Sequence, residues 1–371
     1  MLNSISSLQR QVQQNCHVSD ANYSGTYSLC ILLLRLRNLY KWEKGIPPWQ
    51  EPDHSELLNW VEEREEFWQK LEGCSVSDLE VDGYSVDSMD AEQVNSLLEG
   101  TGLFYGAGLV TGMKPSFLLG RPVEVREQEG LNVCIVDQEL ARDIFSVPLM
   151  RQGNQIVGRR QAMASLLWDE VLELRSSTCQ ALAFAFEQHG LKLHKLRELP
   201  VQESAGFMEV VDKELETWVY HEIGEAVVDV FPGWFWQEMV SQHANTLVEV
   251  FARAVKDVLA DTHPHGLLGH VKARRKSASL GFYLCFMRPL TKTLYPEITQ
   301  AVTSFMQSRS WEEIERARVS GYNRARDLAL SLVDIHESSQ GQDAEQVRDR
   351  IVRELIQPLG LAETLQEEDA E

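Results

Sequence analysis

The fold of the second half of the chain is decided by the segment Asp212-Lys-Glu-Leu-Glu-Thr-Trp-Val-Tyr-His-Glu-Ile-Gly-Glu-Ala-Val-Val-Asp-Val-Phe231. Successive residues of an α-helix are rotated by roughly 100° about its axis. On such a helix one face is apolar, and it contains Val219, Ile223, Ala226 and Val230. The segment therefore predicts a helix over about 212–230 that packs one face into a core.

Three carboxylates extend an apolar row beside that face. The row begins with Val211, Leu215 and Trp218 and continues as Glu222, Glu225 and Asp229. Burying a carboxylate without a partner costs several kcal/mol, so such groups are normally paired, hydrogen-bonded or bound to a cation. His221 and Glu225 are four residues apart, a spacing that lets two side chains on adjacent turns bind one metal ion.

We therefore predict a metal site on this helix, with a divalent Mn, Fe, Zn or Mg ion as the cofactor. His221, Glu225 and Asp229 are the candidate ligands, with Asp229 either a ligand or an outer-shell partner. Glu222 is the candidate catalytic residue, as a general base or an additional ligand. The pattern is not the His-x-x-x-His of zinc proteases, because Glu225 stands at the position of the second histidine.

The chemistry predicted from these residues is metal-dependent hydrolysis of a small anionic substrate. The alternative is a non-catalytic binding or scaffold protein, in which the same acids form salt bridges or a solvated stripe. Its contact surface would include the aromatic cluster at 231–236. Oligomeric state is left open.

A second group of polar residues follows along the chain. Asp257 and Asp261 are four residues apart, and His263, His265 and His270 follow in a loop rich in Pro and Gly. If residues 234–260 form one helix antiparallel to the first, Asp257 is offset from His221 by roughly 20 Å along the axis. A joint site would need another arrangement of the helices, so we do not join the two groups, and we leave open whether Asp257 and Asp261 belong to the site. In that hairpin His243 lies opposite His221.

One dense basic run, Lys272-Ala-Arg-Arg-Lys276, follows this group. It is suited to a phosphate or carboxylate ligand, or to a solvated helix face that pairs with acidic neighbours. We favour the second interpretation.

The first half combines helices with a short β region. Apolar spacing predicts helices over about 25–42, 54–71 and 156–189, and short strands between about 100 and 136. The predicted fold class is mainly α, with helical bundle domains and a small antiparallel β insertion in the first half. The predicted domains are residues 1–200 and 201–362, divided near 195–206, with a disordered acidic tail at 363–371.

Composition limits the partners and the compartment. The 371 residues carry a formal net charge of −21, and 43% of them are hydrophobic. Nucleic-acid and anionic-membrane binding draw on Lys and Arg, so neither partner is expected. The first residues are polar, no apolar run approaches the roughly 20 residues of a membrane span, and the six cysteines form no C-x-x-C pair. We predict a cytoplasmic protein whose partner is a small anionic molecule or another protein.

Two motifs, Asp20-Ala-Asn-Tyr-Ser-Gly-Thr-Tyr-Ser-Leu-Cys30 and Tyr220-His-Glu-Ile-Gly-Glu225, resemble an uncharacterised bacterial protein family. The resemblance touches both halves of the chain and implies a bacterial source. It implies no activity.

Overall fold

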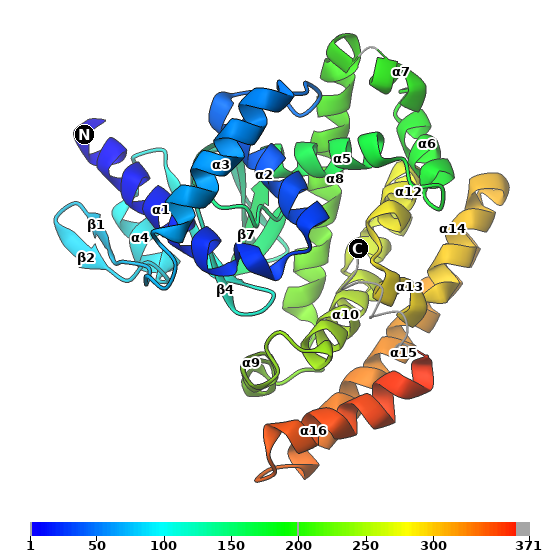
Figure 1. Ribbon diagram of the computed structural model, residues 1–371. Coiled ribbons are helices and arrows are strands. Elements are labelled where there is room, and N and C mark those ends of the chain that lie inside the picture. Colours follow the sequence, from blue (N-terminus) through cyan, green and yellow to red (C-terminus); the bar gives the residue numbers. More distant parts are fainter. Residues whose placement is uncertain (1, 199, 361–371) are drawn as a thin grey trace. The chain divides into compact units, whose positions relative to one another are not determined.

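The computed structural model describes residues 2–198 and 200–360, and it divides into two compact units (Figure 1). The first unit contains residues 2–110 and 114–168; the second contains 111–113 and the residues from 169 onward. The segment 195–206, at which we predicted the domain division, lies in helices α7 (Leu193–Glu198) and α8 (Pro200–Val227) of the second unit. The predicted acidic tail falls outside the described residues.

The first unit surrounds a sheet with helices. Its helices are α1 (Leu2–Tyr23), α2 (Leu29–Lys44), α3 (His54–Gln69) and α4 (Ala91–Leu97), followed by α5 (Arg160–Glu173), which crosses into the second unit. Helix α1 forms because Leu8, Val12 and Cys16 recur at four-residue spacing and are buried against the sheet. Helix α2 is less buried than its composition suggests, since Leu29 is 70% exposed.

Within residues 2–198 and 200–360, seven strands form two sheets. The strands β1 (Leu79–Val81) and β2 (Tyr84–Val86) form a hairpin, and the main sheet contains β3 (Phe104–Val110), β4 (Lys114–Gln128), β5 (Leu131–Arg142), β6 (Leu149–Gln152) and β7 (Gln155–Arg159). The main sheet has the order β3-β4-β5-β7-β6, in which β5 and β7 are parallel and the other neighbours antiparallel. The Gln152 amide of β6 donates to the Ala107 carbonyl of β3, so the sheet curls until its two edges nearly meet.

The predicted fold class is therefore wrong for the first half. Helix accounts for 64% of the described residues, but the 14% in strands includes a mixed, nearly closed five-stranded sheet rather than a small antiparallel insertion. The prediction failed at residues 156–159, which we assigned to a long helix. This short apolar stretch fits either structure by sequence, and its pairing with β5 on one side and β6 on the other makes it part of strand β7.

The second unit is helical. It contains α6 (Cys179–Gln188), α7, α8, α9 (Gly233–Gln242), α10 (Leu247–Thr262), α11 (Leu267–Arg274), α12 (Ser277–Phe286), α13 (Pro289–Leu294), α14 (Pro296–Ser308), α15 (Trp311–Ser338) and α16 (Ala344–Ile351). Helix α10 is central, since it packs against α8, α11, α13 and α15 (Figure 1). Its buried residues Phe251, Val255 and Val258 lie on one face.

Two predicted helices are each divided in the structure. The helix predicted over 156–189 is interrupted after α5, where Leu174 adopts a positive φ of 37°. The helix predicted over 234–260 is interrupted between α9 and α10, where Asn245 has a φ of 58°. Among the described residues, no helix is both long and apolar enough to pass through a bilayer.

Candidate metal centre

The site is built where α8 and α10 approach each other closely. A Cβ atom added to Gly224 of α8 would lie 2.2 Å from the carbonyl oxygen of Ala260 on α10. Only glycine allows a backbone approach this close. His221 contacts Asp261 and Glu225 contacts Lys256, so the two helices run in opposite directions. Gly224, in the second half of α8, thus allows the polar side chains of both helices to come together.

A chain of hydrogen bonds fixes the orientation of His221. Its Nδ1 lies 2.8 Å from Oδ1 of Asp261, and the Tyr283 hydroxyl of α12 donates to Oδ2 of the same carboxylate at 3.0 Å. Nε2 of His221 is then directed toward Glu225, 3.7 Å from Oε1. Histidines that bind metals commonly donate one ring N–H to a carboxylate while the other ring nitrogen binds the ion.

Asp257 completes a group of three potential ligands. His221, Glu225 and Asp257 each offer one ligand atom, and these atoms lie within 4.8 Å of one another. All three side chains are half-buried, so they are neither sealed in the core nor free in solvent. The second carboxylate oxygen of Glu225 contacts the Lys256 ammonium, which lies over the Trp236 ring at 4.9 Å from its centroid. One imidazole and two carboxylates make a donor set for a divalent cation of intermediate or hard character.

The electrostatics of the group favour positive charge at its centre. Burial lowers the pKa of His221, but the charge and hydrogen bond of Asp261 raise it more, and the net pKa lies well above its usual value. Burial raises the pKa of Asp257; the neighbouring His221 opposes this, and Glu225 adds to it. Excess negative charge therefore surrounds the position between the three ligands. Either a proton on His221 or a cation bound there neutralises part of it.

The structure places only some of the predicted site residues in the group of potential ligands. His221 and Glu225 are brought together as expected. Asp229 is exposed, lies beyond the C-terminus of α8, and is not part of the group that the described residues form. Glu222 is only 7% exposed, and its charge contributes to the raised pKa of His221. Its role as general base stays a prediction.

The structure brings together the two polar groups, which we had not joined into one site. The prediction assumed one continuous helix over 234–260, which would place Asp257 far from His221. The interruption after α9 allows α10 to pack directly on α8, and Asp261 lies in hydrogen-bond contact with His221. His243, expected opposite His221, is instead buried with His336 and Arg348 as its charged neighbours.

The remaining polar residues of this region take other roles. Lys272 pairs with Glu315 and Lys276 with Glu216, as expected of a helix face with acidic neighbours. His270 stacks on Tyr220 with ring centroids 3.6 Å apart. Neither feature contributes a ligand to the group.

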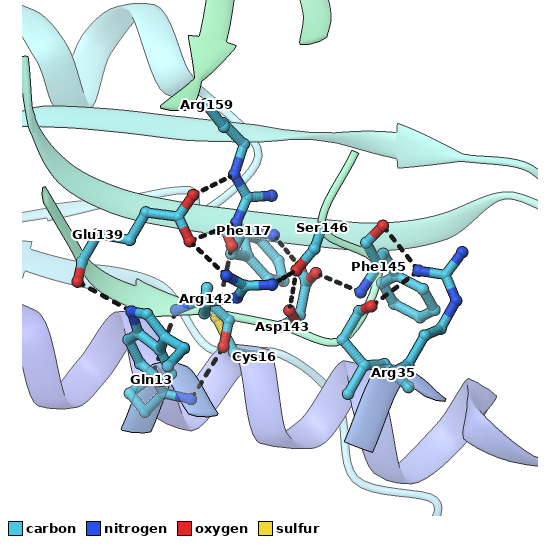
Figure 2. A network of polar contacts seen from close by, with 12 residues as sticks. Gln13, Cys16, Arg35, Phe117, Glu139, Arg142, Asp143, Phe145, Ser146 and Arg159 are labelled. Atoms are coloured by element: carbon cyan, nitrogen blue, oxygen red, sulfur yellow. Dashed lines mark hydrogen bonds and ion pairs between the residues drawn. The ribbon is translucent and has the colours of Figure 1, made fainter. Parts of the chain in front are cut away.

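Sequence reasoning missed a buried ionic network in the first unit, which Figure 2 shows. Arg159 of β7 binds both carboxylate oxygens of Glu139 on β5 at 2.8 and 2.9 Å, and Arg142 binds Glu139 at 3.0 Å. All three side chains are almost fully buried. Burial raises the pKa of Glu139, but the two guanidinium groups lower it further, to about 2.

Two further acids, Asp143 and Asp20, belong to this network. The Asp143 carboxylate accepts hydrogen bonds from the Ser116 hydroxyl and from the Phe117 and Phe145 amides, and Asp20 of α1 accepts from the Ile144 amide. Burial and the charge of Asp143 raise the pKa of Asp20 well above its usual value. Because these contacts join α1, the sheet and the loop after β5, we interpret the network as structural. In the sequence, the only sign of this network is the place of Asp20, four residues after Cys16. The burial of Cys16 itself is known only from the structure.

Comparison with known proteins identifies a family. Residues 7–159 match the model described as "Family of unknown function (DUF6866) N-terminal domain", and residues 164–354 match that of the corresponding C-terminal domain. The search of curated proteins and that of solved structures gave no match. The resemblance to an uncharacterised family is confirmed, and the two matched segments together cover most of both structural units. The chain therefore belongs to this two-domain family of unknown function.

Proposed function

We propose that the second unit binds one divalent metal ion through His221, Glu225 and Asp257. The observation that supports this most directly is the convergence of three ligand atoms within 4.8 Å from two different helices. The hydrogen bonds from His221 to Asp261 and from Tyr283 to Asp261 support it further. Such outer-shell contacts hold a ligand in place before the ion binds and so reduce the entropy lost on binding.

On this basis we propose a cytoplasmic metal-dependent hydrolase that acts on a small anionic substrate. A bound divalent ion supplies Lewis-acid activation and lowers the pKa of its water. Lys256, held beside Glu225 and over Trp236, offers a positive charge that attracts an anionic group to the site. Glu222 is the proposed general base. The alternative is a non-catalytic protein in which protonated His221 and Lys256 balance the acids without a metal.

Metal binding is tested with two matched variants, Asp257→Asn and Asp229→Asn. Each removes one carboxylate with little change in shape, but only Asp257 belongs to the group. We expect stoichiometric binding of Mn²⁺ or Zn²⁺ by the wild-type protein in titration calorimetry. Asp257→Asn should weaken it by at least about 10–100-fold, the loss typical even of outer-shell changes. Asp229→Asn should bind as the wild type does.

Two results would contradict the proposal. One is equal loss of binding in both variants, which indicates diffuse attraction of cations to a chain of charge −21. The other is wild-type protein whose melting temperature is unchanged by Mn²⁺, Zn²⁺, Fe²⁺ and Mg²⁺, which favours the non-catalytic alternative. Hydrolysis is tested separately with p-nitrophenyl phosphate and p-nitrophenyl acetate. Metal binding without turnover of such esters would support the proposed metal site but contradict the proposed hydrolase activity.

A further inference from the structure

The second half of strand β4 pairs with a neighbouring strand on one side only. Residues 114–120 of β4 pair with β3, whereas residues 118–128 pair with β5. From Arg121 to Gln128, β4 is therefore an edge strand among the described strands of the sheet. An edge strand presents unpaired backbone N–H and C=O groups, to which another strand can bind.

The side chains of this edge are exposed and include two valines. Val123 is 67% exposed and Val125 is 66% exposed, which is unusual for β-branched residues in a sheet. Glu124 and Arg126 alternate with Val125 and therefore share the opposite face, where Arg126 Nη1 lies 2.6 Å from Glu124 Oε1. The edge thus carries an apolar residue flanked by two opposite charges.

This short sequence is complementary to itself. Two identical edge strands that join antiparallel are related by a two-fold axis perpendicular to the sheet, and one residue faces its own copy. An axis at Val125 places Glu124 opposite Arg126 of the second copy twice, with Val125 against Val125. An axis at Glu124 or at Arg126 would oppose like charges, which is destabilising.

We infer that β4 is a self-association edge, at which two copies of this chain pair antiparallel about Val125 and join their sheets. Charge complementarity selects both the partner, a second copy, and the register. The interface is short, because Pro122 lacks a backbone donor and a bulge follows it at Val123. The dimer should therefore be weak and dependent on concentration. Repulsion between the net negative charges of the two copies also opposes dimerisation. Salt weakens this repulsion, since the Debye length is about 8 Å at physiological ionic strength.

Charge reversal tests both the partner and the register. Glu124→Arg alone places four arginines at the interface of a homodimer, and Arg126→Glu alone places four glutamates there. We expect each single variant to lose self-association in sedimentation velocity at physiological salt, over concentrations at which the wild-type full chain dimerises. An equimolar mixture of the two should form a heterodimer, because every Arg then faces a Glu. The double variant Glu124→Arg/Arg126→Glu should regain homodimerisation.

Folding does not confound this test, because both residues lie on an exposed edge and the mixture reports association directly. Circular dichroism of each variant should match the wild type. As a second measurement, amide hydrogen exchange of residues 124–128 should slow as the concentration of wild-type protein rises. The inference is overturned if the wild-type chain stays monomeric at high concentration, or if it dimerises equally well in both single variants. It is also overturned if the mixture associates no better than either variant alone.

Discussion

At the scale of single residues, the buried acid Asp20 makes stability depend on pH. Its folded-state pKa is raised by burial and by Asp143, so the folded protein retains a proton that the unfolded chain has lost above about pH 4. The folded state then binds more protons than the unfolded state, and stability falls as pH rises through this range. The stabilisation that Asp20 contributes is thus fully present at acid pH, below the pKa of Asp20 in the unfolded chain. It is lost as the pH rises to the raised pKa of Asp20 in the folded protein.

We predict that Asp20→Asn stabilises the protein more as the pH increases. The amide keeps an oxygen that can accept from the Ile144 amide and carries no charge to desolvate. In urea unfolding between about pH 5 and about pH 9, the difference from wild type should grow by up to about 1.4 kcal/mol per pH unit. A difference that does not change with pH would contradict a raised pKa.

Asp143→Asn is the control for that prediction. The same substitution in the same network should destabilise the protein, because the Asp143 carboxylate accepts three hydrogen bonds that an amide cannot all accept. Asp20→Asn should thus raise the stability of the protein, whereas Asp143→Asn should lower it. This difference distinguishes a buried acid that keeps its proton from one whose carboxylate serves as a hydrogen-bond acceptor.

At the scale of helices, the close contact of α8 and α10 depends on Gly224. Gly224→Ala must push the helices apart, because the new Cβ would meet the Ala260 carbonyl backbone. Alanine favours a helix over glycine by about 1 kcal/mol, but overpacking a core typically costs about 1–3 kcal/mol. We predict a lower melting temperature together with weaker metal binding, measured by thermal unfolding and titration calorimetry.

Gly206→Ala on the same helix provides the matched control. A Cβ at Gly206 would meet only a terminal methyl group of Leu191, 2.9 Å away, on a side chain that can move. This variant should be as stable as the wild type or more so, with unchanged metal affinity. Equal effects at both glycines would show that helix propensity, rather than the contact with α10, determines the outcome.

At the scale of the whole molecule, charge restricts the partners. The 56 acidic residues outnumber the 35 basic ones, so a chain of net charge −21 repels a polyanion overall. We predict no change in the anisotropy of a labelled DNA duplex at protein concentrations up to about 10 μM, within the range where non-specific DNA-binding proteins bind. Binding that weakens steeply with added salt would contradict this and would indicate a local basic surface.

Local sequence patterns predicted many helices of the second half and the proximity of two candidate ligands. Helical periodicity depends on neighbours within two turns, so the apolar face that contains Val219 and Ile223 and the proximity of His221 to Glu225 could be predicted locally. The same reasoning identified the helix around 54–71, which the structure confirms as α3.

The tertiary structure alone decided how these parts combine. Asp257 joined the candidate group because a break after α9 and the contact at Gly224 set where α10 packs, and Asp229 did not because α8 ends before it. Residues 155–159 became a strand because β5 offered a parallel partner, and Glu139 could be buried because Arg159 of β7 reaches it in addition to its near neighbour Arg142. Each outcome depends on an interaction between distant segments. Local spacing carries no information about such interactions.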